Sequence, residues 1–300
     1  MNKDWTDRTI GFIGLGVMGA PMCRNMRQKT GLRFLVHDLD RGAVDVMVGH
    51  GAAAADDVGS LARACDVLFV SLPSGKVLEA VARGAAGAGA LAHMKRGAIF
   101  VDLGTSSVAL TRELAAEFAA RGVRYLDAPV ARTRQAAETG TLSIMVGGDE
   151  ATFREVEPLL ACCANDITHC GATGSGQITK ILNNMVLFQT VVALSEAYAI
   201  AQKNGFDPKL IFETLTKGSG DSFALRNHGA KAMLPRQFPE RAFSVEYARK
   251  DLSYALELAA AGGVDAAGAR HVDALFAEAI AKKLGDQYFP VVSRLVNREV

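Results

Sequence analysis

The chain has few of the residues that mark a secreted or a metal-dependent protein. Its 300 residues include five cysteines without a Cys-x-x-Cys pair, and six histidines without a His-x-His or His-x-x-x-His pair. Zinc sites and disulfide frameworks depend on such spacings, so we expect no metal site and reduced thiols, as in a cytoplasmic protein. Residues 1–9 contain no long apolar run, so we expect no secretory signal.

An excess of charge of one sign is also missing. The 33 lysines and arginines against 32 aspartates and glutamates leave a formal charge of +1, which argues against nucleic acid and an acidic membrane surface as partners. The most apolar stretch, residues 185–201, contains Gln189, Ser195 and Glu196 and is shorter than the roughly 20 residues of a membrane span. The hydrophobic content of 49% is enough for sizeable cores, and the length suggests two domains.

The first half of the chain alternates between short apolar runs rich in β-formers and amphipathic segments rich in alanine. We expect strands at residues 8–13, 33–37, 67–72, 98–103, 125–128 and 141–146. We expect helices at residues 18–29, 60–64, 107–121 and 150–163. This alternation predicts an α/β, Rossmann-like, doubly wound parallel sheet.

The pattern changes after Gly176. Residues 178–204 are expected to form one long helix, apolar on most sides, which predicts burial between layers. Further helices are expected at residues 208–217, 243–261 and 266–283, with no further strand. We therefore expect a Rossmann-like domain over residues 1–173 and an all-α C-terminal domain over residues 174–300, joined by the long helix. One small domain cannot bury all the apolar surface of this long helix, so we expect a homo-oligomer.

A glycine-rich turn, Gly14-Leu15-Gly16-Val17-Met18-Gly19, follows the first expected strand and precedes the first expected helix. In such a turn the first glycine permits the tight bend, the second lets a pyrophosphate approach the backbone, and the third lets the helix pack closely on the strand. The N–H groups at the start of the helix then face the phosphates. The alternative is a turn without a ligand, but the position between strand and helix predicts a dinucleotide site.

An acidic residue, Asp38, closes the second expected strand. Its carboxylate is suited to the ribose hydroxyls of the adenosine and would repel a 2′-phosphate, which favours NAD over NADP. Asp40 adds negative charge, whereas Arg41 would suit a 2′-phosphate and keeps NADP open. A residue that only forms the turn after the strand is the alternative for Asp38.

One lysine and two asparagines lie close together on the long helix. Lys180 and Asn184 are four residues apart and share a face, with Asn183 beside them. A lysine on an apolar helix can hydrogen-bond a carbonyl during reduction and receive an alcohol proton during oxidation. The alternative is a lysine whose stem packs and whose ammonium reaches water.

Several motifs then occur in an order that indicates a family. They are residues 11–19, Asp127-Ala128-Pro129-Val130, Gly140-Thr141-Leu142, Met145-Val146-Gly147-Gly148, Lys180 with Asn183-Asn184, and Lys250-Asp251-Leu252. With them the chain resembles the β-hydroxyacid dehydrogenase family, the group of 3-hydroxyisobutyrate dehydrogenase and tartronate semialdehyde reductase. The resemblance implies a Rossmann-like domain followed by an all-α domain, NAD(P) as hydride carrier, Lys180 as the catalytic residue, and dimers or tetramers formed through the helical half. It also implies a cofactor cleft lined by Leu72, Pro73, Thr105 and Lys250, although Lys250 alternatively is a solvated helix lysine.

The sequence departs from this family at two places. The family usually has Asp-x-Ser-Thr after the fifth strand, whereas this chain has Gly104 before Thr105, with two serines following. Where the family has Ser-Gly-Gly to hold the substrate carboxylate, this chain has Ala131-Arg132-Thr133. A guanidinium suits carboxylate, sulfonate or phosphate. The Arg-Thr pair is similar to the Gly-Arg-Thr of the sulfolactaldehyde reductase branch, over these two residues alone.

Together with the patterns above, this resemblance implies an NAD-dependent oxidoreductase for a small 3-hydroxy acid and its semialdehyde. In this hypothesis Lys180 exchanges the proton, Asn183 and Asn184 orient lysine and substrate, and the anionic end is held by Thr105 and residues 131–133, chiefly Arg132. One alternative is a reductase of a sulfonated or other anionic short aldehyde. Imine reduction is another, although an Asp or Tyr usually takes the place of Lys180 there. The third is a dinucleotide-binding scaffold without turnover, which a cofactor-reduction assay would distinguish.

Overall fold

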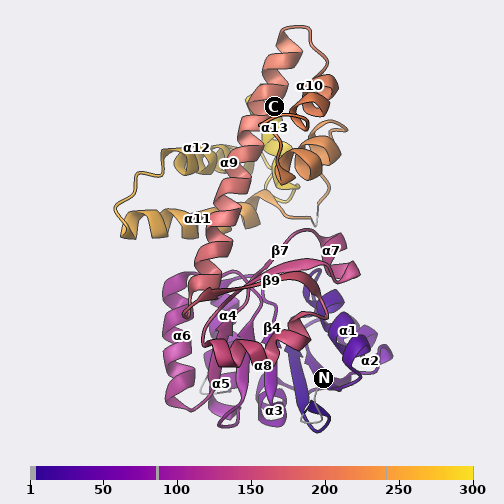
Figure 1. Cartoon of the computed structure of the whole chain (residues 1–300), viewed down its shortest axis with the longest axis vertical. Coiled ribbons are helices and arrows are strands. Elements are labelled where there is room, and N and C mark those ends of the chain that lie inside the picture. The colour runs from indigo at the N-terminus through magenta and orange to yellow at the C-terminus, as the bar shows by residue number, and fades with distance from the viewer. Residues whose placement is uncertain (1–4, 86–87, 241, 300) are drawn as a thin grey trace. The chain divides into compact units, whose positions relative to one another are not determined.

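The chain folds into two compact units. The computed structural model describes residues 5–85, 88–240 and 242–299. The units are Met1–Lys180 and Ile181–Val300 (Figure 1). The division lies inside one continuous helix, α9 (Ser175–Lys203), shortly after the boundary expected between residues 173 and 174. Residues 1–4, part of the segment in which no secretory signal is expected, lie outside the described residues.

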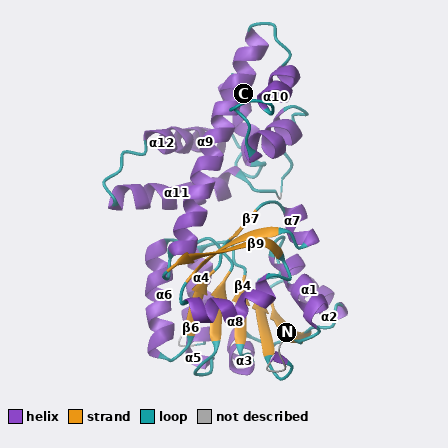
Figure 2. Cartoon of the chain, viewed as in Figure 1, coloured by secondary structure: helices purple, strands orange, loops and turns teal. Residues whose placement is uncertain are grey.

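The first unit is built on one nine-stranded sheet (Figure 2). Its strands in chain order are β1 (Thr9–Ile13), β2 (Arg33–His37), β3 (Ala53–Ala54), β4 (Val67–Val70), β5 (Ile99–Asp102), β6 (Arg124–Asp127), β7 (Val130–Ala131), β8 (Leu142–Gly147) and β9 (Ala164–Gly171). The strands lie in the order β3-β2-β1-β4-β5-β6-β8-β7, and β9 pairs with β8. Neighbours from β3 to β6 are parallel, which confirms the Rossmann-like sheet.

The other end of the sheet departs from the expected parallel arrangement. Strand β8 is antiparallel to both β6 and β7, while β9 is parallel to β8. Strands β3, β7 and β9 are not among the strands expected from the sequence. The first two are only two residues long, and β9 contains asparagine, aspartate and glycine, which have low β-propensity, on a strand that is largely half-exposed or exposed.

Helices cover both faces of this sheet. They are α1 (Gly19–Thr30), α2 (Arg41–Gly49), α3 (Val58–Ala64), α4 (Gly75–Arg83), α5 (Ala90–His93), α6 (Val108–Ala120), α7 (Arg134–Thr139) and α8 (Glu150–Leu160). Two hydrophobic cores result: one contains Phe69 of β4 and Phe153 of α8, and the other contains Phe100 of β5 and Phe118 of α6. The rings of Phe100 and Phe118 stack at 4.6 Å between centroids. A sheet buried on both faces is typical of doubly wound folds.

The cysteines belong to these layers as free thiols. Cys23, Cys65, Cys162 and Cys163 are buried, and Cys170 on β9 is half-buried. Burial raises the pKa of Cys65 and of Cys163 to about 12. All five cysteines are free thiols in the structure.

The second unit is helical over its described residues. After α9 it contains α10 (Pro208–Leu215), the π-helix η3 (Leu225–Met233), α11 (Val245–Ala261), α12 (Ala267–Ala281), the 3-10 helix η4 (Phe289–Val292) and α13 (Ser293–Val296). Its core is aromatic: the ring of Phe289 lies 5.2 Å from that of Phe188 and 5.4 Å from that of Phe243, centroid to centroid. The expected all-α half is thus confirmed, and π-helix η3 is an addition that periodicity did not indicate.

Helix α9 is less buried than the sequence predicts. Leu182, Val186 and Ile200 are exposed on it, at 41%, 59% and 63%. Within the described part of the chain, α9 is the one helix whose length and apolar composition could span a membrane. Of its most apolar window, 44% is buried inside the protein, and the exposed apolar side chains lie on the remainder of the helix surface.

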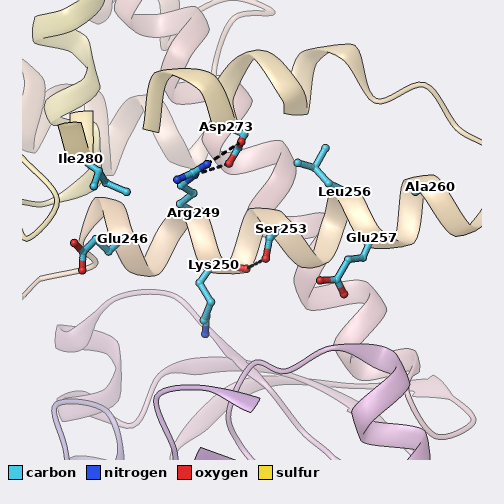
Figure 3. A pocket seen from close by; sticks show the side chains of 9 residues that line it. All are labelled: Glu246, Arg249, Lys250, Ser253, Leu256, Glu257, Ala260, Asp273 and Ile280. Atoms are coloured by element: carbon cyan, nitrogen blue, oxygen red, sulfur yellow. Dashed lines mark hydrogen bonds and ion pairs between the residues drawn. The ribbon is translucent and has the colours of Figure 1, made fainter. Parts of the chain in front are cut away.

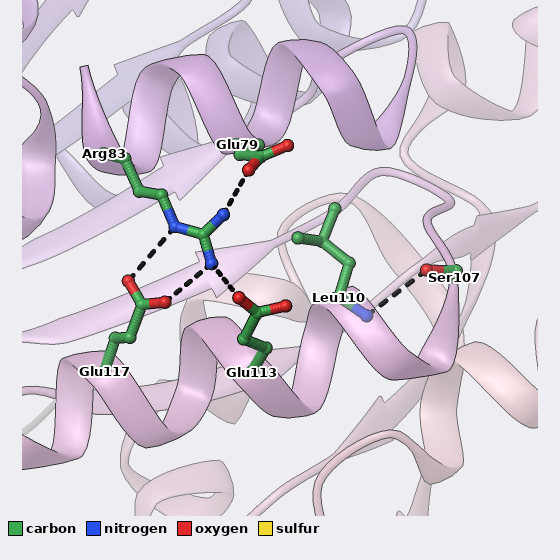
Figure 4. A network of polar contacts seen from close by, with 6 residues as sticks. All are labelled: Glu79, Arg83, Ser107, Leu110, Glu113 and Glu117. Carbon is green, nitrogen blue, oxygen red and sulfur yellow. Dashed lines mark hydrogen bonds and ion pairs between the residues drawn. The ribbon is translucent and has the colours of Figure 1, made fainter. Parts of the chain in front are cut away.

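An arginine with three carboxylates links α4 to α6 (Figure 4). Arg83 donates from Nη2 to Glu117 at 2.6 Å and from Nε to the same carboxylate at 3.2 Å. Glu113 on α6 also pairs with Nη2, and Glu79 on α4 pairs with Nη1. The guanidinium holds the pKa of Glu117 below its usual range.

We expect Arg83→Met to lower the free energy of unfolding by about 1 kcal/mol at low salt, because three carboxylates then face one another without a cation. The loss should shrink near 1 M salt, where the screening length falls to about 3 Å. Urea unfolding at the two salt concentrations measures it. Arg154→Met is the control, since Arg154 pairs with carboxylates of its own helix alone. Equal losses in both variants would show that the link between α4 and α6 contributes nothing.

Candidate active site

The glycine-rich turn after β1 fits a dinucleotide. A Cβ at Gly14, where φ is +91°, would lie 2.2 Å from the carbonyl oxygen of Ser71, and one at Gly19 would lie 1.9 Å from that of Gly14. Both glycines are therefore required by close backbone packing. A Cβ at Gly16 would meet no atom within 4 Å, so its backbone faces open space of the kind that a pyrophosphate needs.

The start of α1 also suits a phosphate. Its N-cap, Met18, makes no capping hydrogen bond with its side chain, whereas the N–H of Ala20 binds the carbonyl oxygen of Gly16 at 3.1 Å and Pro21 has no N–H. Leu15 is buried and Val17 is half exposed, at 49%. The side chain of Leu15 therefore packs into the protein, and that of Val17 contacts solvent.

Asp38 supports this turn from the end of β2. Its Oδ2 accepts a hydrogen bond from the N–H of Leu15 at 2.6 Å, and its Oδ1 accepts one from the N–H of Asp40 at 2.8 Å. Asp40 in turn caps α2 by accepting from the N–H of Gly42 at 2.9 Å. The carboxylate of Asp38 therefore holds the glycine-rich turn directly, a contact that sequence spacing did not indicate.

Two further segments follow neighbouring strands at the same edge of the sheet. Leu72 is half-buried and Pro73 exposed after β4, and Thr105 is buried after β5. Since β1, β4 and β5 are parallel and adjacent, their carboxyl ends share an edge. A Cβ at Gly104 would lie 3.1 Å from the carbonyl oxygen of Leu72 and 3.1 Å from Oδ1 of Asp102, so the chain is closely packed at this position.

A buried carboxylate anchors the start of α9 to this edge. Asp127, the last residue of β6, accepts from the N–H of Gly174 at 2.8 Å and from the N–H of Gln177 at 2.9 Å. Burial raises the pKa of Asp127, and these N–H bonds oppose the rise. A Cβ at Gly176 would lie 2.4 Å from the carbonyl oxygen of Met145, so the first turn packs backbone to backbone on β8. The motif that contains Asp127 gives no sign of this role in the sequence.

Lys180 lies about one turn beyond this anchor. Its side chain belongs to a residue that is only 9% exposed, which is rare for a lysine. Asn184 follows four residues later on the same helix and is also buried, whereas Asn183 is exposed and donates to the Oδ1 of Asn184 at 3.2 Å. The structure therefore separates the two asparagines, which the sequence analysis treated alike.

Within the second unit, Asn184 and Lys250 share one carboxylate. Asn184 donates from Nδ2 to Asp251 at 2.7 Å, and the Nζ of Lys250 lies 2.9 Å from the other oxygen of that buried carboxylate. The Nζ of Lys250 also lies 3.9 Å from the centroid of the Tyr247 ring. The sequence motif that contains Asp251 suggests no role for it. In the structure Asp251 connects two of the predicted site residues, Asn184 and Lys250.

Lys250 also lines an open pocket of about 690 Å³ along α11 and α12 (Figure 3). Figure 3 shows Lys250 and Arg249 leaving α11 in different directions. Arg249 pairs with Asp273 of α12, with 2.8 Å between nitrogen and oxygen. Every residue that lines this pocket belongs to the second unit.

The predicted substrate loop lies at the antiparallel end of the sheet. Ala131 ends β7, and Arg132 adopts φ of +86°, a backbone conformation typical of glycine. The guanidinium of Arg132 donates to the carbonyl oxygen of Thr141 at 2.7 Å and forms an ion pair with Asp166. Thr133 caps α7 by accepting from the N–H of Ala136 at 3.4 Å. Arg132 and Thr133 thus already have protein partners.

Comparison with known proteins identifies the family. Residues 9–171 match the NAD binding domain of 6-phosphogluconate dehydrogenase, and residues 174–295 match the NAD-binding domain of NADP-dependent 3-hydroxyisobutyrate dehydrogenase. The chain belongs to the β-hydroxyacid dehydrogenase family. It is 38% identical to 2-(hydroxymethyl)glutarate dehydrogenase of Eubacterium barkeri, over 85% of this chain and 83% of that one. It is 36% identical to 2-hydroxy-3-oxopropionate reductase of Escherichia coli, over 84% of each chain.

A solved structure agrees with this membership. The structure of Mycobacterium tuberculosis 3-hydroxyisobutyrate dehydrogenase with L-serine superposes with a TM-score of 0.87 at 32% identity, covering 96% of this chain and 99% of that one. The protein is accordingly an oxidoreductase with an NAD(P)-binding domain. Among its described residues no group of histidine, cysteine, aspartate and glutamate side chains could hold a metal ion.

We expect Asp127→Asn to lower the free energy of unfolding by about 2 kcal/mol, because an amide offers one acceptor where two buried N–H groups each need one. Asp149→Asn is the matched control. Asp149 is an ordinary N-cap that accepts from Thr152, and asparagine caps about as well as aspartate, so the change there should stay within about 0.5 kcal/mol. Denaturant unfolding measures both. Similar losses in the two variants would contradict the anchoring role of Asp127.

Proposed function

We propose that the protein catalyses the reversible, NAD-dependent oxidation of a small 3-hydroxy acid to its semialdehyde, as 3-hydroxyisobutyrate dehydrogenase does. The observation that carries this proposal is the buried Lys180 on the first turns of a helix that Asp127 holds to the carboxyl edge of the sheet. The glycine-rich turn lies at the same edge, after β1. A proton-transfer group and a dinucleotide site are thereby built on the same rigid sheet.

The chemistry divides between cofactor and protein. A bound nicotinamide would supply the hydride acceptor for oxidation and the hydride donor for reduction. In oxidation Lys180 Nζ receives the proton of the hydroxyl as the C–H bond breaks. In reduction its ammonium polarises the carbonyl and gives the proton back, and its burial strengthens that electrostatic effect. Asn184, with Asn183 beside it, orients the lysine and the substrate, while Thr105 holds the anionic end together with residues 131–133.

Cofactor binding is assigned to the glycine-rich turn together with residues at the ends of β2, β4 and β5 and on α11. These residues are Asp38, Leu72, Pro73, Thr105 and Lys250. Asp38 favours NAD, because a carboxylate at the end of β2 repels a 2′-phosphate. Arg41, exposed at the start of α2, is the feature that would suit NADP.

Lys180→Ala should lower kcat by at least about a hundredfold, the scale of a positioned acid or base, and should leave the dissociation constant of NADH nearly unchanged. The measurement is cofactor reduction with a panel of 3-hydroxy acids, together with NADH binding by fluorescence. Lys180→Arg is the control that keeps the charge but cannot lose its proton near neutral pH. Turnover near the wild-type value in Lys180→Ala would end this mechanism.

A second candidate substrate class is a sulfonated or otherwise strongly anionic short aldehyde. Arg132 favours it, because a guanidinium suits a sulfonate or phosphate as well as a carboxylate. The partner of Arg132, Asp166, has a side chain that is 59% exposed. Ion pairs this exposed contribute at most about 1 kcal/mol, so a substrate anion can displace Asp166 at low cost.

Arg132→Ala and Arg132→Gly test this role as a pair. If the guanidinium binds the anion, both variants should raise KM for anionic substrates by about tenfold, the worth of one charged hydrogen bond. Alanine keeps the strain of the positive φ and glycine relieves it, so a loss in alanine alone would instead assign the effect to the backbone. Arg134→Ala is the control, since Arg134 is exposed on α7. Unchanged KM values across carboxylates and a sulfonate in both variants would exclude the anion clamp.

The exposed apolar side chains of α9 support a homo-oligomer. Leu182 and Val186 are one turn apart on the helix and leave an apolar strip uncovered in the single chain. We assign this strip to a contact between copies in a homodimer or homotetramer. A cytoplasmic location fits the free thiols. Residues 1–173 form the cofactor-binding domain, and residues 174–300 form the helical domain for substrate binding and oligomerisation.

A further inference from the structure

Gln177 is a fully buried polar residue three positions before Lys180 on α9. It has no exposed surface, although it lies in the first turn of α9. Its Nε2 donates to the carbonyl oxygen of Gly104 at 2.9 Å, and its Oε1 accepts from the N–H of Ser106 at 3.2 Å. One amide therefore binds the backbone on both sides of Thr105.

These partners leave one possible orientation of the amide. Gly104 offers an acceptor and Ser106 offers a donor, so a flipped amide would place like groups against each other in both contacts. The Nε2 also lies 3.4 Å from the carboxylate of Asp102, a second acceptor on the same side. The surrounding donors and acceptors therefore fix the orientation of the Gln177 amide.

The turn after β5 has its own internal support. Asp102 accepts from the N–H of Gly104 at 2.8 Å and from the hydroxyl of Ser106 at 3.4 Å. That hydroxyl lies 3.2 Å from the hydroxyl of Thr111 on α6. Gln177 adds what this support lacks, namely a connection from the turn to helix α9.

The backbone of Gln177 is held as firmly as its side chain. Its N–H binds Asp127 at 2.9 Å, and Lys180 follows three residues later on the same helix. The residue is therefore tied to β6 through its main chain and to the turn after β5 through its side chain. The geometry points to a positioning role: we propose that Gln177 sets Thr105 relative to Lys180 and so aligns the group that holds the substrate with the group that exchanges its proton. This rests on the function proposed above.

Such a role predicts a loss of turnover that is separate from the loss of stability. Gln177→Met keeps the length of the side chain but leaves two buried backbone groups without their partner. Misplacement of a reacting group by about 1 Å can cost about a hundredfold, so kcat should fall by about ten- to a hundredfold at a temperature where the variant is folded. The dissociation constant of NADH should change less than kcat does.

Thr111→Val is the matched control. It removes the hydroxyl at the other end of the same buried network and lowers stability, but it leaves the connection to α9 in place. Its kcat should stay within about twofold of the wild type, while its melting temperature falls as in Gln177→Met. An amide that serves stability alone would give both variants the same pattern.

Gln177→Glu supplies a second measurement, which holds if Gln177→Met fails to fold. The introduced carboxyl can donate to Gly104 or Asp102 and accept from Ser106 when it is protonated, but repels Asp102 when ionised. Burial and that neighbouring carboxylate raise its pKa, so its kcat relative to wild type should fall by about tenfold as pH rises through that pKa. The wild type and Thr111→Val should show no such fall in their ratio.

The outcomes separate this proposal from the function on which it rests. A folded Gln177→Met with kcat within about twofold of the wild type, or a flat ratio for Gln177→Glu between about pH 5 and about pH 8, would overturn the positioning role alone. Absence of wild-type turnover with every hydroxy acid and sulfonate in the panel would overturn the proposed function instead.

Discussion

The carboxylate of Asp127 is the constraint on which the site depends. It ends the strand β6, is buried, and accepts the N–H groups of Gly174 and Gln177 where α9 begins. Without these two bonds the start of the helix would carry unpaired donors inside the protein, a cost of about 1 to 3 kcal/mol each. The bonds therefore place the helix, and with it Lys180, at the carboxyl edge of the sheet. The close approach of Gly176 to β8 fixes the same turn from another side.

The features that sequence patterns predict well are those with a short, local cause. The glycine-rich turn was predictable because close backbone approach excludes every side chain at Gly14 and Gly19. Parallel strands were predictable because apolar runs alternate with amphipathic helices over the first half of the chain. Lys180 and Asn184 were predictable as a pair because four residues make a helical face.

The features that sequence patterns missed depend on partners far along the chain. Asp127 meets residues 47 and 50 positions away, and Gln177 meets residues 71 and 73 positions away, distances at which no periodicity carries information. The antiparallel end of the sheet was missed because β7 is too short and β9 too polar to show a strand pattern. Arg132 was singled out for its charge, and its glycine-like backbone conformation has no sequence signal at all.

The burial of the thiols determines how readily they are modified chemically in the folded protein. A thiol reacts with oxidants and alkylating reagents as the thiolate, and burial raises the pKa of Cys65 and of Cys163 to about 12, which disfavours the thiolate at neutral pH. Those two sulfurs also lie in the cores on opposite faces of the sheet. Their chemical modification therefore requires the nucleotide-binding unit to open. The rate at which a reagent labels these two cysteines measures that opening. The labelling rate of the half-buried Cys170 reports only local accessibility at the surface.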